Sequence, residues 1–583
     1  MKKHNISTEY PTWEINSFRD LLDGITARYP DNTAFAWRDA DAENGIASRT
    51  YAEAAEDIKN LATYLCAMGL EGRHIAVCGK NSYLWEISYL AVMCGCGVAV
   101  PLDKELCTDE LAGLLAEGDC AAILYGEDMT EALSAIDLPD LLKLPMAAMS
   151  DYLANGAALR AVGSRVFENH TIDPDAPGVI LYTSGTVGIA KGVMLSQRSL
   201  CRNTLAVCKT VLIREDDCVL THLPLHHIYE CASHMAFLYS GACIAFNDNL
   251  RQMPADLTLF RPTVLVTVPA VLDFIAHFVR RGYKEARGGK LLLGVQRAAT
   301  GMVSAPLSLL SKSGAAKTRR SIYSTVHTFM GGKLRAILVG AAPLSSEIFL
   351  QLEKFGYAVY AGYGLTEASP TVLMHSDRYR SAQDVGHPLP GVEVCIDAPD
   401  STGEGELCVR GEGVMLGYYK NEEETAHALR GGWLHTGDLA VKTPSGAYRI
   451  TGRIKSMIVM PTGRKVYPEE QEAMIKAHPL VSDCMVYAAE EDGTPTLCAA
   501  VYPDITLLTA QLQLPENTDL ATLSEEQTAR AKELLLDIIR TSNAKLPTYK
   551  HIKRLVIRKT PFDKTALGKL RRTSAEINGI SSK

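Results

Sequence analysis

The sequence predicts an α/β fold in which parallel sheets are covered by helices on both faces. Short apolar runs rich in β-branched residues and bounded by Gly, Pro or Asp recur along the chain, among them HIAVCG, GVAVPL, AAILYG, GVILYT, TVLVTV and RAILVG. Helical patterns separate several of these runs; in residues 51–70, for example, Ile58, Leu61, Ala62 and Leu65 fall on one helical face. Continuous apolar strands that alternate with helices are typical of parallel sheets buried on both faces.

The sequence pattern changes near residue 385, where short strands with Gly turns begin, as in GELCVRGEGVMLGYY. This pattern predicts a smaller β-rich unit. After Arg453 the pattern is that of an α+β domain, with a long helix expected near residues 525–546. We therefore expect an N-terminal domain at 1–452, with its β-rich part at about 385–452, and a C-terminal domain at 453–583.

Composition excludes several classes of protein. The 583 residues include 59 Lys+Arg and 67 Asp+Glu, for a net charge of -8, and 47% are hydrophobic, which excludes a disordered or fibrous chain. The 15 cysteines form no CxxC pair, which favours a reducing compartment over a disulfide framework. The first residues lack the apolar run of a signal peptide, and we find no apolar stretch of about 20 residues. We expect a cytoplasmic protein without a nucleic-acid partner.

One segment departs from the acidic average. Residues 280–335 carry 12 Lys+Arg and a single acid, Glu285. The first interpretation is a solvated face of a loop-rich insertion. The second is a patch for peripheral contact with an anionic membrane.

The segment from Val179 to Val193, VILYTSGTVGIAKGV, carries the strongest chemical signal. An apolar strand leads into a Thr/Ser/Gly loop that ends at Lys191, and a helical pattern begins at Ser196. Such a loop offers backbone N–H groups, hydroxyls and a lysine charge to a phosphate. It is not a Walker loop, because Lys191 is followed by Gly192 and not by Ser or Thr. The alternative is an ordinary Gly/Ser loop after a strand.

The run YTSGTVGIAKGV resembles the phosphate loop of the adenylate-forming superfamily, which includes acyl-CoA synthetases, firefly luciferases and the adenylation domains of peptide synthetases. Segments that resemble its other motifs follow in the family's order: LPLHHIYE (223–230), GAAPL (340–344), YGLTE (363–367), GELCVRG (405–411), WLHTGDLA (433–440), YRITGRIKSMIV (448–459) and KTALGK (564–569). LPLHHIYE and the long insertion after it are most similar to long-chain fatty acyl-CoA synthetases. The resemblance implies a large N-terminal domain of two doubly wound sheet subdomains plus a small β-rich subdomain, followed by a small mobile α+β C-terminal domain.

The resemblance also implies a nucleotide site. Glu367 would bind Mg²⁺, Thr366 would donate to the α-phosphate, and Tyr363 would offer its ring to adenine. Without the resemblance, Glu367 fits a surface ion pair and Tyr363 fits core packing. The remaining residues implied to bind ATP phosphates or adenine are Thr183, Ser184, Gly185, Thr186, Gly188, Lys191, Gly340, Ala341, Ala342 and Gly364.

Two further residues are implied to hold the ribose. Asp438 would accept hydrogen bonds from both ribose hydroxyls, although a Gly-Asp turn can also be a turn former and nothing more. Arg453 would bind ribose or phosphate oxygen. Lys455 aligns with the family's hinge, about which the C-terminal domain rotates between two half-reactions. Gly463 would then approach the site where the pantetheine of CoA enters; its alternative is an ordinary hairpin turn.

The catalytic assignments come from the same resemblance. Lys569 would bridge the substrate carboxylate and the α-phosphate during adenylation only, a task that suits a point charge on a flexible stem. His227 would control access to the acyl and thiol tunnels, and its alternative is a core histidine. The chain departs from the common pattern at Val187, Ala190 and Ser456. The missing hydroxyl at Val187 removes one phosphate donor.

The implied function is an acid–thiol ligase that uses ATP, Mg²⁺ and CoA to activate a carboxylic acid, with medium- to long-chain fatty acids as the expected substrates. Two alternatives stay open at this point. One is an acyl- or aryl-adenylating enzyme that loads the phosphopantetheine of an acyl carrier protein. The other is a non-catalytic relative that binds a nucleotide or a lipid.

Overall fold

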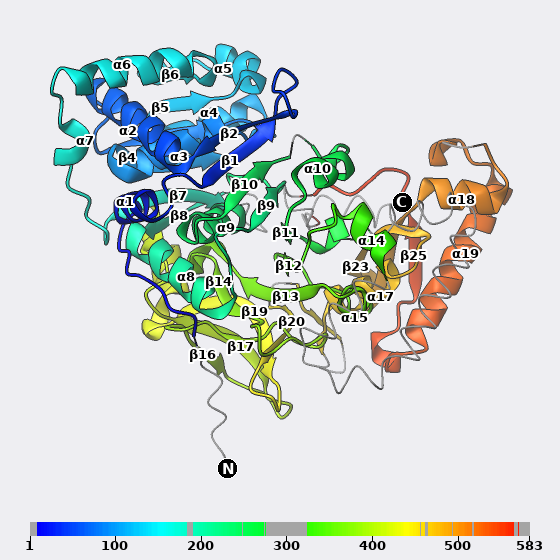
Figure 1. Cartoon of the computed structure of the whole chain (residues 1–583). Helices are drawn as coiled ribbons and strands as arrows, with labels where there is room; N and C mark the ends of the chain where they lie inside the picture. The colour runs from blue at the N-terminus through cyan, green and yellow to red at the C-terminus, as the bar shows by residue number, and fades with distance from the viewer. Residues whose placement is uncertain are drawn as a thin grey trace. The chain divides into compact units, whose positions relative to one another are not determined.

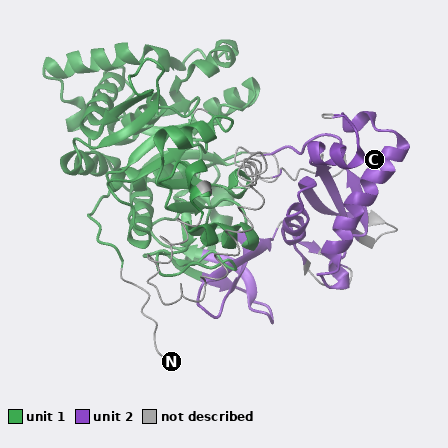
Figure 2. Ribbon diagram, turned by 45° about the vertical axis from the view of Figure 1, so that its right-hand side comes forward, with its two compact units in different colours: residues 1–183, 190–394, 409–435 green, residues 184–189, 395–408, 436–583 purple. Residues whose placement is uncertain are grey.

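The computed structural model describes most of the chain as two compact units (Figure 2). Unit 1 lies within residues 1–183, 190–394 and 409–435, and unit 2 within residues 395–408 and 436–583. The described residues are 9–183, 190–247, 249–272, 275, 323–454, 456–460, 465–491, 494–515, 518–564 and 570.

Unit 1 contains a seven-stranded sheet in the order β18-β8-β7-β4-β3-β5-β6 (Figure 1). Its strands β7, β4, β3, β5 and β6 are parallel, whereas β8 and β18 are antiparallel to their neighbours. The strands are β3 (Arg73–Cys78), β4 (Gly97–Leu102), β5 (Cys120–Tyr125), β6 (Leu142–Pro145), β7 (Pro177–Thr183), β8 (Lys191–Ser196) and β18 (Gly417–Tyr418).

A nine-stranded sheet in the order β15-β14-β13-β12-β11-β9-β10-β1-β2 forms the other sheet of unit 1. It is parallel from β13 to β1 and antiparallel at both edges. The strands are β1 (Thr33–Arg38), β2 (Ile46–Thr50), β9 (Cys218–Thr221), β10 (Cys243–Phe246), β11 (Val264–Thr267), β12 (Ala336–Val339), β13 (Ala358–Gly364), β14 (Thr371–Met374) and β15 (His387–Pro388).

Helices pack on these sheets as the apolar patterns predict. In α2 all four residues of the expected face, Ile58, Leu61, Ala62 and Leu65, are buried. The helices of unit 1 are α1 (Phe18–Arg28), α2 (Tyr51–Ala67), α3 (Tyr83–Gly95), α4 (Thr108–Glu117), α5 (Thr130–Ala135), α6 (Met149–Ala161), α7 (Val166–Asn169), α8 (Gln197–Thr210), α9 (Ile228–Tyr239), α10 (Met253–Phe260), α14 (Ser324–Phe329), α15 (Ser346–Phe355) and α16 (Glu422–Ala428).

The β-rich stretch forms a four-stranded sheet in the order β16-β17-β19-β20. Its strands are β16 (Glu393–Asp397), β17 (Glu404–Arg410), β19 (Leu434–Lys442) and β20 (Tyr448–Arg453). The pair β21 (Ile458–Val459) and β22 (Lys465–Val466) follows it in the chain.

The last part of unit 2 packs helices against a three-stranded sheet, β23-β24-β25. Its elements are α17 (Pro468–Lys476), β23 (Val481–Glu491), β24 (Thr494–Pro503), α18 (Ile505–Leu512), α19 (Glu525–Asn543) and β25 (Arg554–Ile557). The helix α19 confirms the long helix expected near residues 525–546, and its residues Leu535 and Ile539 join the core over the sheet.

The structure therefore confirms the predicted α/β class with its large N-terminal and smaller C-terminal parts. The antiparallel edge strands differ from the expectation of parallel sheets. The short connection between β7 and β8, residues 184–190, explains why these two strands are antiparallel. Parallel neighbours need a much longer crossover connection. Among the described helices, none combines the length and the apolar composition that crossing a bilayer requires.

A buried ion pair ties α9 to α3. The ring Nδ1 of His234 lies 2.9 Å from Oε2 of Glu86, and its Nε2 lies 3.7 Å from Oε1 of Glu230; all three residues are buried. Burial opposes protonation of the ring, but the two carboxylates outweigh it and raise the pKa of His234 to about 10. His234 is therefore protonated at neutral pH, and it fixes the helix that begins directly after His227.

We predict that His234→Gln lowers the free energy of unfolding at pH 7 by about 3–5 kcal/mol, because it leaves buried carboxylates without their cation. The pH dependence follows from the raised pKa. The contribution of His234 is complete below its ordinary pKa of 6.5, shrinks as pH rises, and is lost above about pH 10.

Urea unfolding at pH 6, 8 and 10 measures both effects. The difference between wild type and His234→Gln should fall toward pH 10. His170→Gln is the control, because His170 pairs with the largely exposed Glu71. A constant difference across this pH range would show that His234 is neutral in the folded protein.

Candidate functional site

The predicted residues Gly340, Tyr363 and Gly364 lie at the carboxyl edge of the nine-stranded sheet, together with two residues that were not among the predicted site residues. His222 follows β9, Thr267 ends β11, and Gly340 follows β12. His222 Nε2 lies 3.1 Å from Oγ1 of Thr267, and the backbone N–H of Gly340 donates to the carbonyl of Thr267 at 3.3 Å. Ligands bind at this edge in open α/β sheets because loops there leave room beyond the strand ends. Tyr363 and Gly364, at the end of β13, lie one strand further along the same edge.

Two glycines at this edge lie close to their neighbours, tightly at Gly340 and with no room for a Cβ at Gly364. A Cβ on Gly340 would come within 3.2 Å of the ring of Tyr229. A Cβ on Gly364 would lie 2.0 Å from the carbonyl oxygen of Pro370. Glycine therefore lets the backbone come close to its neighbours here, and the short helix η3 (Thr366–Ala368) with two of the predicted site residues follows directly.

His227 stands at the start of α9 on the same unit. Its carbonyl accepts from the backbone N–H groups of Glu230 and Cys231, at 3.1 and 3.2 Å, so it is the N-cap residue of the helix. The neighbouring His226 lies 3.6 Å from the carboxylate of Asp103. This placement fixes the backbone of His227, and its predicted role in access control stays a prediction.

A tyrosine that the sequence analysis missed brings two predicted residues together. The hydroxyl of Tyr418 donates to Oε1 of Glu367 at 2.9 Å, and Lys191 Nζ lies 5.1 Å from the centre of the Tyr418 ring. Strand β18 places the ring, since Tyr418 pairs with Val193 of β8. Burial, together with the nearby Glu367 carboxylate, raises the pKa of the Tyr418 hydroxyl, which therefore stays a donor.

Lys191 also has an acidic partner. Its Nζ forms an ion pair with Oε2 of Glu424, the third residue of α16. The Thr183 hydroxyl donates to the carbonyl of Lys191 at 3.4 Å, so the two described ends of the predicted phosphate loop are joined. The helix expected from Ser196 is confirmed, since α8 begins directly after its N-cap Ser196. Lys191 itself begins β8, a strand antiparallel to β7 that had not been expected.

In unit 2, Asp438 and Arg453 form an ion pair with 2.9 Å between Arg453 Nε and Asp438 Oδ1. The two residues are register partners on β19 and β20. The Asp438 side chain is only 6% exposed whereas Arg453 is 47% exposed. The predicted ribose residues thus lie together, and a carboxylate with a guanidinium can accept from hydroxyls and bind an anion at one place.

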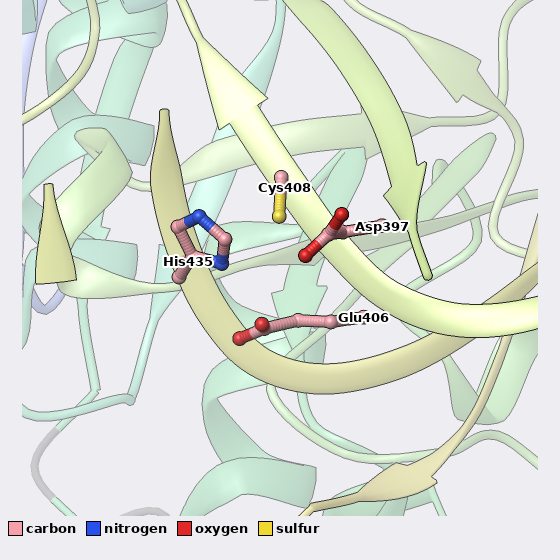
Figure 3. A group of neighbouring side chains, drawn as sticks. All are labelled: Asp397, Glu406, Cys408 and His435. Carbon is pink, nitrogen blue, oxygen red and sulfur yellow. The ribbon is translucent and has the colours of Figure 1, made fainter. Parts of the chain in front are cut away.

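Glu406 supports the turn before Asp438. Its Oε1 accepts the backbone N–H of Gly437 at 2.9 Å, and the hydroxyl of Thr436 donates to the carbonyl of Leu407 at 2.7 Å. Figure 3 shows Glu406 among the side chains of Asp397, Cys408 and His435, and one donor atom from each lies within 4.8 Å of the others. These are ligand types that could hold a divalent cation. The predicted magnesium ligand, Glu367, is not one of them.

Ala341 and Ala342 directly follow Gly340, and Ala341 has a positive φ of 67°. Seven other predicted residues lie outside the described part of the chain. They are Ser184, Gly185, Thr186, Gly188, Lys455, Gly463 and Lys569. Of the described ones, Lys191 and Glu367 lie near Tyr418, and Thr183 pairs with Lys191. Tyr418 lies in the run GELCVRGEGVMLGYY, whose pattern predicts strands but does not indicate a contact with Glu367.

Comparison with known proteins finds relatives that cover most of the chain. The profile of the AMP-binding enzyme family matches residues 23–419, and that of the AMP-binding enzyme C-terminal domain matches residues 455–578. The long-chain-fatty-acid–CoA ligase FadD15 of Mycobacterium bovis is 29% identical over 471 residues, or 78% of this chain and 77% of that protein.

Two solved structures are similar in fold. The anthranilate CoA ligase AuaEII in complex with anthranoyl-AMP has a TM-score of 0.73 at 18% identity, with 99% of this chain and 98% of that chain covered. ATP-bound MatB from Rhodopseudomonas palustris has a TM-score of 0.71 at 22% identity, with 97% and 99% covered. At this identity the likeness shows the shared fold.

Proposed function

The chain belongs to the AMP-binding enzyme family, and on that basis we propose that it is an ATP-dependent acid–thiol ligase that converts a fatty acid into its CoA thioester. The structural observation that supports this proposal is that Lys191 and Glu367 both lie near Tyr418. Lys191 is the register partner of Thr183, the last residue of the strand that leads into the phosphate-loop motif, which supports a role for this cation in phosphate binding. The relationship to a long-chain-fatty-acid–CoA ligase supports the choice of acid and thiol.

The first half-reaction must bring two anions together. A carboxylate oxygen of the acid attacks the α-phosphorus of ATP, the bond from that phosphorus to the β-phosphate oxygen breaks, and pyrophosphate leaves. Catalysis then consists of positioning and of positive charge at the phosphoryl oxygens. Lys191 would supply such a charge to the phosphates, Thr366 would donate to the α-phosphate, and Lys569 would bridge the two reactants.

The donor set fits a magnesium ion at Glu367. This residue is half-buried, its Oε1 is oriented by Tyr418, and within the described part of the chain no hydrogen bond reaches Oε2. Mg²⁺ binds to proteins through one or two carboxylates together with the phosphates of a substrate. The bound ion would neutralise charge on the phosphate oxygens. Glu367 holds it, and Tyr418 keeps the carboxylate in place.

The second half-reaction forms the thioester. The sulfur of CoA attacks the acyl carbon of the acyl-adenylate, the mixed-anhydride bond breaks, and AMP leaves. We propose that Asp438 and Arg453 retain the adenosine moiety meanwhile through ribose and phosphate oxygens. We further propose that the C-terminal domain begins at residue 453 and rotates about a hinge at Lys455. This rotation would bring Gly463 to the site where the pantetheine of CoA enters.

An apolar tunnel would take the acyl chain. We propose that it is lined from residues 267–274, from GAAPL and from the stretch after Tyr363. Val268, Val271 and Leu272 in the first of these segments are buried. A pocket of this kind distinguishes neighbouring chain lengths by only about 1–3 kcal/mol per methylene. Medium- to long-chain acids are therefore proposed as a class.

Three finer points complete the proposal. We propose CoA as the acceptor of the acyl group. The alternatives are an acyl carrier protein as the acceptor or an aromatic acid as the substrate. Thioester assays with each of these compounds distinguish them. We propose a cytoplasmic location. We also propose peripheral contact with anionic membrane through residues 280–335, of which the structure describes 323–335, and vesicle co-sedimentation at low and high salt tests it.

The first test is Lys569→Ala. We expect adenylate formation to fall about a hundredfold, a loss of about 3 kcal/mol of transition-state stabilisation, because the bridging charge is gone. Thioester formation from supplied acyl-adenylate should stay close to wild type. Single-turnover assays of the two half-reactions measure this. An equal loss in both would remove Lys569 from the adenylation step.

The second test is Tyr418→Phe. It removes the hydroxyl that orients the Glu367 carboxylate, and such outer partners typically change metal affinity about 10–100-fold. We expect the Mg²⁺ concentration for half-maximal adenylation to rise about tenfold. Tyr419→Phe is the matched control, since the Tyr419 hydroxyl donates to the exposed Asp119. If both variants keep the wild-type magnesium dependence, Tyr418 does not support a metal at Glu367.

A further inference from the structure

A buried aspartate in unit 2 binds two lysines. Asp483, on β23, is 2% exposed. Its Oδ1 accepts from Lys476 Nζ at 2.9 Å, and its Oδ2 lies 2.5 Å from Lys564 Nζ. A β-bulge in β23 between Val481 and Asp483 shifts the pairing with β24 at this point, and such irregularities re-aim a side chain.

The two lysines come from different places in the chain. Lys476 ends α17, the helix that packs against β23. Lys564 is the first residue of the KTALGK motif, five positions before Lys569, and no role has been given to it so far. Each lysine side chain is about 40% exposed, so the two ammonium groups stay partly solvated, whereas the carboxylate of Asp483 is buried.

Both ends of the segment that carries Lys569 are fixed. Lys564 and Leu570, the described residues on either side of 565–569, form an antiparallel β-bridge with each other. Leu570 packs against a small core that contains Phe562, Met485 and Tyr487. Phe562, two residues before Lys564, is 4% exposed. The ion pair between Lys564 and Asp483 adds a polar attachment at one residue of this bridge, and the apolar contacts of Leu570 attach the other.

We propose that Asp483, through Lys564, is a positioning residue that directs the segment of Lys569 for adenylation. The inference rests on the proposed function, because it assigns to Lys569 the bridging role given above. A flexible lysine stem delivers its charge usefully only if its backbone is held, since orientation contributes much of the rate in a two-reactant step. The buried carboxylate supplies that attachment from a strand in the core of the same unit.

The test uses the full-length chain and both half-reactions. Lys564→Met keeps the length of the stem and removes the charge. We expect it to slow adenylate formation tenfold or more and to leave thioester formation from supplied acyl-adenylate within twofold of wild type. Lys564→Arg, which keeps the charge, should recover adenylation to within threefold. Lys476→Met is the matched control, because it removes the other lysine of Asp483, and it should stay within threefold in both assays.

Three further variants separate positioning from stability. Asp483→Asn should behave like Lys564→Met, and the double variant should be no slower than either alone. In a Lys569→Ala background, Lys564→Met should have no additional effect on adenylation. The urea midpoint of each protein identifies any that is unfolded; Lys564→Met, at a largely exposed position, stays informative if Asp483→Asn does not fold.

The proposal is overturned if Lys564→Met adenylates at the wild-type rate, if both half-reactions fall in proportion, or if the effects of Lys564→Met and Lys569→Ala multiply. Failure of the proposed function looks different, because wild type itself would then form no acyl-adenylate and the comparison of variants would have no baseline.

Discussion

Charge balance around Tyr418 is the constraint on which the proposed site depends. A site for the phosphates of a nucleotide needs a cation, and a cation on a half-buried strand needs a counter-charge before any ligand arrives. Lys191 meets this need by pairing with Glu424, while Tyr418 lies between Lys191 and Glu367. In the proposed function, a phosphate at Lys191 would replace the Glu424 carboxylate as the counter-charge of a lysine whose side chain is 27% exposed.

The two sheets of unit 1 supply the rigid parts of this arrangement. Parallel strands of the nine-stranded sheet end at one edge, where His222, Thr267 and Gly340 lie together. The seven-stranded sheet brings in Lys191 through β8, and its edge strand β18 adds Tyr418. Unit 2 holds its own pair, Asp438 and Arg453, on adjacent strands. Of these side chains, those of Thr267, Lys191, Tyr418, Asp438 and Arg453 are on strands, and His222 directly follows one.

The sequence predicted the class of fold and the strands well, because long apolar runs bounded by Gly or Pro have few alternative structures. It predicted the helix after Ser196 but no strand at Lys191–Ser196, because one partner of that strand, β18, lies more than 200 residues away. Tyr418 was missed for the same reason: its role comes from long-range pairing with β8. The pairs Lys191–Glu424 and Lys564–Asp483 also join residues far apart in the chain, which periodicity does not reveal.

Carboxylate-dependent exchange of radiolabelled pyrophosphate into ATP, measured with a panel of aliphatic and aromatic acids, tests the central claim most directly. The account predicts exchange that requires both a carboxylic acid and Mg²⁺, is strongest with medium- to long-chain fatty acids, and proceeds without CoA. ATP bound with no exchange for any acid in the panel would contradict it and leave a nucleotide-binding protein without adenylating activity.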